Sequence, residues 1–133
     1  MMFKSGYLVD TDVIINYLKG KSKSKEFLMK IIDGKNAGFF SVITEAELLS
    51  GARNDKEEAS IYYVLDIMEA IEVERKMAVT AGNLRRKYAA YSTKLPDALI
   101  AATAKERELI VATANEKYFK VFDEIEKEYV TEA

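Results

Sequence analysis

The chain has 133 residues, of which 49% are hydrophobic and 32% are charged, as is typical of one globular domain spanning residues 1–133. It contains no cysteine and no histidine, which excludes disulfides, the usual zinc sites, and catalysis by Ser-His-Asp or Cys-His groups. The formal net charge of −2 gives no overall sign of nucleic-acid binding, and a catalytic metal would need oxygen ligands, which favours Mg²⁺ or Mn²⁺.

The first half of the chain has apolar patterns that predict two strands and three helices. The apolar run that ends at Val9 predicts a short buried strand over residues 3–9. A helix is expected over residues 13–18, with Thr11 or Asp12 as its N-cap and Gly20 at its end. The elements expected next are a helix over 25–35 that stops at Gly34, a strand over 37–42 and a helix over 44–50.

The second half continues the alternation of helices and strands. The patterns predict helices over 57–70, 77–91 and 95–108, strands over 71–73 and 109–112, and one helical turn over 116–119. The tail after residue 119 fits either a helix or a strand. Strands that alternate with helices predict a central, mostly parallel sheet with helices on both faces, which is a three-layer α/β/α fold.

Charged residues are distributed unevenly along the chain. Basic side chains are concentrated within residues 19–35 and again within 85–94, whereas the tail is acidic. The first basic group fits either a solvated face or a surface for RNA or a partner, and Tyr88, Tyr91 and Tyr118 fit core packing better than base stacking. No stretch reaches the roughly 18 apolar residues of a membrane span, and residues 1–6 lack the apolar region of a signal peptide, so we expect a cytoplasmic protein.

Several polar residues stand where predicted strands end. Asp10 directly follows the first strand, Glu45 follows the second at the start of a helix, and Asn115 follows the fourth with Thr113 just before it. Ligands of an open parallel α/β sheet bind outside the carboxyl ends of its strands, so these residues are expected at one edge. Asp97 belongs with them if the helix that starts at Pro96 begins at the same edge.

Carboxylates that face one point repel each other unless a cation lies between them. Positive helix N-termini before Glu45 and Asp97 reduce this repulsion. A cage of carboxylate oxygens suits Mg²⁺, which bridges them to phosphate oxygens and activates water without a histidine base. The acids therefore predict a metal-dependent site for phosphoryl chemistry.

Each acid also has a structural interpretation. Asp10 or Asp12 could cap the first helix, and we expect Asp12 to be the cap and Asp10 the functional acid. Thr44 and Glu47 fit a capping box, which would give Glu47 a structural role and leave Glu45 free. Asp97 after Pro96 fits a first-turn acid that only complements the helix dipole.

Four segments in this order resemble the PIN domain, in particular the toxin ribonucleases of VapBC toxin–antitoxin systems. The segments are residues 7–15, 41–51, 95–104 and 109–119, so the resemblance covers nearly the whole chain. It implies a ribonuclease that depends on Mg²⁺ or Mn²⁺, a homodimer, and an antitoxin that inserts a segment near the site. It also implies that Asp10, Glu45 and Asp97 bind the metal, and that Thr113 and Asn115 support the site or the attacking water.

The chain departs from the family pattern at Asn115, where many members have aspartate. Asparagine offers a neutral carbonyl oxygen and no charge, so we expect one firm metal instead of two. The departure also leaves room for an alternative, a catalytically weak PIN-fold module that binds RNA or protein. A second alternative is a phospho-acceptor receiver domain, with Asp10 and Asp12 as its acid pair, Lys117 as its late lysine and Asp55 as the residue phosphorylated.

Overall fold

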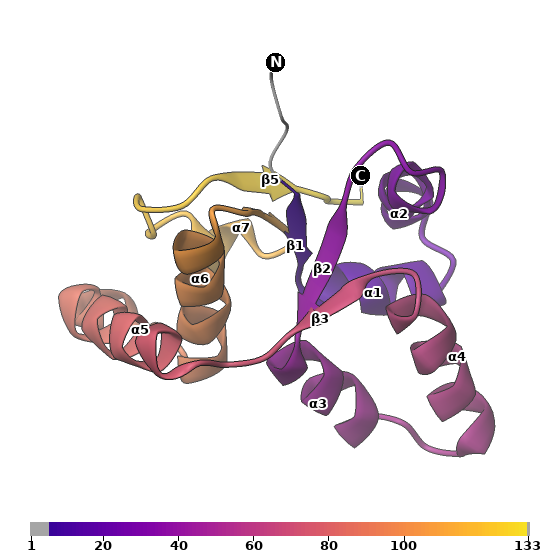
Figure 1. Cartoon of the computed structure of the whole chain (residues 1–133), viewed down its shortest axis with the longest axis horizontal. Coiled ribbons are helices and arrows are strands. Elements are labelled where there is room, and N and C mark those ends of the chain that lie inside the picture. Colours follow the sequence, from indigo (N-terminus) through magenta and orange to yellow (C-terminus); the bar gives the residue numbers. More distant parts are fainter. Residues whose placement is uncertain (1–5, 133) are drawn as a thin grey trace.

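The computed structural model describes residues 6–132, and the strands found there form one parallel sheet (Figure 1). The sheet has five strands in the order β3-β2-β1-β4-β5, and every neighbouring pair is parallel. The expected three-layer α/β/α architecture is confirmed. The start of the chain and the first part of the predicted segment 3–9 lie outside the described residues. The strands are β1 (Tyr7–Val9), β2 (Gly38–Ser41), β3 (Glu69–Ile71), β4 (Ile110–Thr113) and β5 (Lys127–Tyr129).

The predicted helices are all present, with shifted ends. The helix expected over 57–70 ends earlier, because a turn over residues 66–68 leads into β3 at Glu69. The helix expected to reach residue 91 is α-helical only to Lys87 and continues as a 3₁₀ turn. The helices are α1 (Thr11–Leu18), α2 (Ser22–Ile32), α3 (Val42–Ser50), α4 (Asp55–Leu65), α5 (Arg75–Lys87), α6 (Leu95–Arg107) and α7 (Glu116–Phe119), with a 3₁₀ turn at Ala89–Tyr91.

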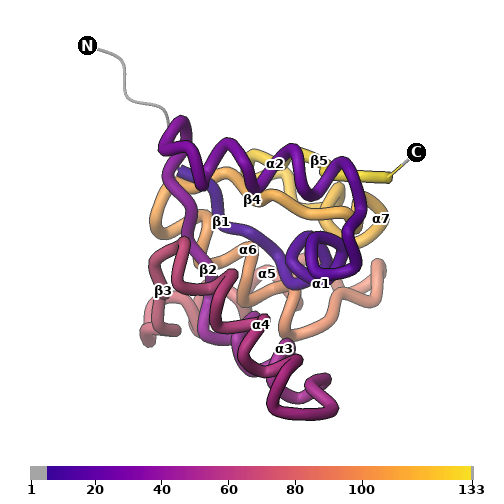
Figure 2. The backbone as a smooth tube through the Cα atoms, turned by 90° about the vertical axis from the view of Figure 1, so that its right-hand side faces the viewer, coloured from indigo at the N-terminus to yellow at the C-terminus, as the bar shows by residue number. Residues whose placement is uncertain are grey.

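Alternate residues of the central strands face opposite sides of the sheet and make two separate cores. Leu8 of β1 and Val111 of β4 pack with α5, α6 and α7, whereas Val9 and Ala112 pack with α1, α2, α3 and α4. This period of two is what a strand covered on both faces requires. Figure 1 shows α5 and α6 together on one side of the sheet, and Figure 2 shows α1 to α4 covering the other.

The tail after residue 119, left open between helix and strand, forms the edge strand β5 beside β4. Beyond β5, the Glu132 carboxylate accepts hydrogen bonds from the backbone N–H groups of Lys23 (3.1 Å) and Ser24 (3.0 Å) at the start of α2. The acidic tail thus places a negative charge at a helix N-terminus, where the helix dipole favours it.

The strand order places β1 at the centre of the sheet, between β2 and β4. The chain proceeds outward from β1 to β2 and β3, and then returns across the sheet to β4 on the other side of β1. The carboxyl ends of β1 and β4 therefore flank a topological switch point, where open α/β sheets form their ligand sites. Within residues 6–132, no helix combines the length and apolar character needed to cross a membrane.

Candidate active site

Asp10 lies at the switch point, one residue beyond β1, and its carboxylate is fixed from two sides. One oxygen accepts a 2.9 Å hydrogen bond from the Thr11 backbone N–H, and the other accepts a 2.9 Å bond from the Thr113 hydroxyl. The side chain is only 4% exposed. Asp10 is also the N-cap of α1, so the prediction of Thr11 or Asp12 as the cap was wrong. The helix begins two residues earlier than expected, and Asp12 lies in its first turn.

Thr113 connects the ends of β1 and β4. Its buried hydroxyl donates to Asp10 and accepts a 3.0 Å hydrogen bond from the Asn115 backbone N–H. The next residue, Ala114, donates its N–H to the Asp12 carboxylate at 3.2 Å. The structure therefore brings Asp10, Thr113 and Asn115 together, as expected from their positions after strands, and adds Asp12 to the group.

Burial dominates the electrostatics of these acids. Burial and the neighbouring charge of Asp12 raise the pKa of Asp10, although the hydrogen bonds from Thr113 and Thr11 oppose the shift. Burial likewise raises the pKa of Asp12. Asp10 and Asp12 are near neighbours, and both shifts oppose ionisation, so holding the two carboxyls ionised would require positive charge nearby.

Asp97 joins this group from α6. It lies in the first turn of that helix, after Pro96, and is partly buried. Burial and the negative charge of Glu47 raise the pKa of Asp97; Lys94 lowers it, and Asp12 adds a smaller upward shift. Asp97 is therefore close to Asp12 and Glu47, and α6 does begin at the edge where β1 and β4 end.

Glu47 occupies the place expected for Glu45. Its carboxylate accepts a 2.6 Å hydrogen bond from the Thr11 hydroxyl, and the hydroxyl oxygens of Thr11 and Thr44 lie within hydrogen-bond distance at 3.1 Å. Positions two apart on an α-helix point about 200° apart, so Glu45 cannot share this face of α3 with Glu47. Among the described residues, the structure brings Glu47 to Asp97 and gives Glu45 no hydrogen bond or ion pair with the cluster.

The start of α3 explains this correction. The helix begins at Val42, with the Ser41 hydroxyl accepting a hydrogen bond from the Ile43 N–H, so Thr44 and Glu47 form no capping box. Thr44 is instead a buried residue one turn before Glu47, and both contact Thr11. Ser41 is itself a good N-cap residue, and reading it as the cap would have placed Thr44 and Glu47, three residues apart, on one face of the helix.

The donor set suits a hard divalent cation. Asp10, Asp12, Glu47 and Asp97 supply carboxylate oxygens, and Oδ2 of Asp12 is buried without a hydrogen-bond partner. Within residues 6–132, no three acidic side chains converge closely enough to hold an ion as they stand. Carboxylates repel one another when no cation separates them, so binding would require their side chains to rotate inward.

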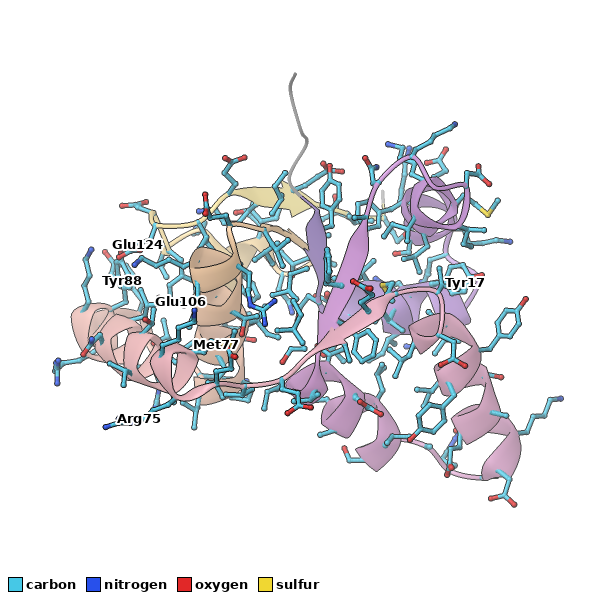
Figure 3. All side chains as sticks on the ribbon, viewed as in Figure 1. Tyr17, Arg75, Met77, Tyr88, Glu106 and Glu124 are labelled. Atoms are coloured by element: carbon cyan, nitrogen blue, oxygen red, sulfur yellow. The ribbon has the colours of Figure 1, made fainter. Side chains whose placement is uncertain are left out.

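Basic and aromatic side chains lie at the Asp97 end of the cluster. The Lys94 and Lys117 ammonium groups lie 5.5 Å and 5.7 Å from the centre of the Tyr118 ring. Arg85 donates to the Thr93 carbonyl at 3.1 Å and so holds the segment that leads to Lys94. Tyr88 is used structurally, because its hydroxyl donates to Glu124 at 2.9 Å between α5 and the tail (Figure 3).

A groove runs beside Glu47, which is one of its lining residues. It has a volume of about 590 Å³ and lies among α1, α3 and α4. Apolar side chains of Ile15, Leu18 and Ile61 line it together with the basic residues Arg53 and Lys56. The position of Asp55 removes the receiver-domain alternative, because Asp55 begins α4 and does not follow a strand.

Comparisons with known proteins agree with this geometry. The family model described as "PIN domain" matches residues 7–125. The chain is 33% identical over 121 residues to Ribonuclease VapC10 of Mycobacterium tuberculosis, covering 89% of each chain. It is 27% identical over 124 residues to Ribonuclease VapC19 of the same species, covering 92% of this chain and 98% of that one.

Solved structures share the same fold. A toxin–antitoxin complex from Klebsiella pneumoniae contains a chain that is 27% identical, with a TM-score of 0.79, covering 97% of this chain and all of that one. A chain of VapBC2 from Rickettsia felis, solved bound to a DNA fragment from its promoter, is 22% identical and superposes with a TM-score of 0.81. That match covers 92% of this chain and 97% of the other.

Proposed function

The chain belongs to the PIN domain family, and from this we propose that it is a metal-dependent endoribonuclease, the toxin of a toxin–antitoxin pair. The observation that carries the proposal is the group formed by Asp10, Glu47 and Asp97 at the switch point of the sheet. Three separate elements bring these acids together from distant parts of the chain. The relatives named as ribonucleases support the choice of RNA as the substrate.

Asp10, Glu47 and Asp97 are the residues that we propose to hold Mg²⁺ or Mn²⁺. Glu47 replaces Glu45 in this assignment because it faces Thr11 and Asp97. When bound, the cation would neutralise charge on a phosphate and make water a better nucleophile. No histidine is present to act as a base, so the reaction depends on oxygen groups.

The chain's own residues orient this chemistry. Thr113 fixes the Asp10 carboxylate and also holds the backbone of Asn115, so both residues keep a set position relative to β1. Asn115 can offer its amide group to a phosphate or to water. The N-terminus of α6 lies beside Asp97 and contributes partial positive charge where a phosphate would approach.

RNA would approach past Lys94, Lys117 and Tyr118. Lysine side chains bind phosphates without regard to sequence, and the Tyr118 ring, which packs partly against the core, offers its remaining surface for base stacking. Lys94 is exposed and belongs to the same short segment as Asp97, so a phosphate held there would lie close to the acids.

The proposal includes an antitoxin as partner, because the similar solved structures contain toxin–antitoxin complexes. The groove beside Glu47 is where we expect its inserted segment, since occupation there would block access to the acids. An amphipathic segment would match the apolar lining, with Lys19 and Lys56 beside it for acidic side chains, because Arg53 is already paired with Glu57. A homodimer remains a prediction from the resemblance, and a cytoplasmic location remains a prediction from the sequence.

The test is cleavage of a labelled RNA pool by antitoxin-free protein in the presence of Mg²⁺, Mn²⁺ or EDTA. We expect cleavage that requires the cation, and a loss of at least about a hundredfold in Glu47→Gln and Asp97→Asn. The matched control is Glu45→Gln, which makes the same chemical change on the same helix and should retain activity. Activity that survives in Glu47→Gln and disappears in Glu45→Gln would contradict the assignment.

The alternative of a binding module is favoured by one observation, the neutral Asn115 in place of an acid. Folded protein that binds RNA but cleaves none of it with either metal would support this alternative. Restored cleavage in Asn115→Asp would then identify the missing charge as the cause.

A further inference from the structure

Asp12 has a feature that a helix-capping role does not explain. Its Oδ1 accepts the hydrogen bond from Ala114, but Oδ2 is buried without a partner. A buried carboxylate oxygen that lacks a hydrogen bond costs free energy, so an unpaired one in a native fold calls for a reason. Asp10, which is the N-cap, already satisfies the first N–H of α1.

The surroundings of Asp12 contain other acids and little to balance them. Its charge raises the pKa of both Asp10 and Asp97, so the three carboxyls are near neighbours. Among the ion pairs of the described residues, none involves Asp12. Lys94 acts on Asp97, but no lysine or arginine of the described residues is paired with Asp12, so positive charge beside Asp12 is left to be supplied by a ligand.

Asp12 also adjoins the position where the chain lacks an acid. Ala114, which donates to Asp12, directly precedes Asn115, and the Asn115 backbone is tied to Asp10 through Thr113. A carboxylate on the first turn of α1 can therefore reach the same side of the site as a carboxylate on residue 115.

We propose that Asp12 supplies the fourth carboxylate of the metal site and takes over the negative charge that Asn115 does not provide. The inference rests on the proposed function only in requiring a divalent cation at this cluster. RNA cleavage is not needed for it to hold. It replaces the structural role expected for Asp12 from the sequence with a ligand role for its free Oδ2.

Direct Mn²⁺ binding tests the inference without RNA. The free Mn²⁺ signal in electron paramagnetic resonance is followed as metal is added to wild type, Asp12→Asn, Glu45→Gln and Asp10→Asn. The asparagine at position 12 keeps an oxygen for Ala114 and removes only the charge. We expect Asp12→Asn to weaken Mn²⁺ binding by about tenfold or more, Asp10→Asn to weaken it further, and Glu45→Gln to leave it unchanged.

The double variant Asp12→Asn with Asn115→Asp separates a charge effect from damage to the fold. We expect the second change to recover most of the lost affinity, because it returns one carboxylate to the same side of the site. Thermal unfolding without metal shows whether Asp12→Asn folds, and removal of an unpaired buried charge should leave it at least as stable as wild type.

The outcomes separate this inference from the proposed function. Wild-type affinity in Asp12→Asn overturns the inference, and so does the absence of any Mn²⁺ binding by wild type. Binding that depends on Asp12 in a protein that never cleaves RNA supports the inference while the nuclease proposal fails.

Discussion

The substitution Thr113→Val removes the hydroxyl that joins the two central strands and changes little else. Valine has nearly the same shape, and Thr113 is 0% exposed, so packing should be kept. The variant loses the bond to Asp10 and the acceptor for the Asn115 N–H. A hydrogen bond to a charged group contributes about 1.5–3 kcal/mol, and a neutral one about 1 kcal/mol. We expect the free energy of unfolding to fall by about 2–4 kcal/mol.

Urea denaturation of metal-free protein measures this loss, with Thr113→Ser and Thr131→Val as controls. Serine keeps the hydroxyl, and Thr131 is an exposed residue of the tail. At about 3–5 °C per kcal/mol for a chain of this size, the melting temperature should drop by roughly 10 °C. The Mn²⁺ affinity should fall about tenfold, because Asp10 loses the group that orients it. Equal stability of Thr113→Val and wild type would refute the role given to this hydroxyl.

Two further predictions concern charge. Because burial raises the pKa of Asp10, Asp12 and Asp97, the folded metal-free protein binds more protons than the unfolded chain, so its stability should fall as pH rises above about 4. Urea titrations across pH should show this fall in the free energy of unfolding, and bound Mn²⁺ should make the fall smaller. Stability that rises with pH over this range would contradict the prediction. Lys94→Gln should weaken RNA binding and lower the salt dependence of log K by about one, whereas Lys120→Gln, at the exposed residue that follows α7, should not; equal salt slopes would exclude a phosphate contact at Lys94.

Residues that follow strands could be placed from the sequence because the reasoning needed only strand ends and a parallel sheet. Asp10, Thr113 and Asn115 are together in the structure for that reason. Asp97 required one more assumption, that α6 begins at the same edge, and the structure supports it.

The choice between Glu45 and Glu47 could not be made from strand ends. It depended on which residue starts α3, and a shift of two residues turns a helix by about 200° and exchanges the side chains that face the site. From the sequence, Ser41 is as good an N-cap candidate as Thr44. Only the structure, in which Ser41 caps α3 and Glu47 contacts Thr11, decides between Glu45 and Glu47. Helix ends are the least certain part of a pattern-based prediction, and here the choice of a proposed metal ligand depended on one.

Asp12 shows a different limit. The sequence pattern predicted a helix cap, but the structure has its Oδ1 accept a hydrogen bond from Ala114, about a hundred residues away in the chain, and leaves Oδ2 without a partner. No local pattern reports a contact of that range. The strand β5 is similar, since its short polar sequence forms a strand through pairing with β4.

The bonds that Thr113 at the end of β4 and the following Ala114 make to Asp10 and Asp12 also bear on when a newly made chain can become active. They join residues 103 and 102 positions apart, so the ribosome must complete most of the chain before the site can exist. Chains emerge from the N-terminus at about 5–20 residues per second, and α1 to α6 precede β4 in this order. A nascent chain that carries Asp10, Glu47 and Asp97 but lacks β4 has no formed cluster. A toxin built in this way would not cleave the RNA around it during its own synthesis. It would need its antitoxin only in the short interval after β4 has been made.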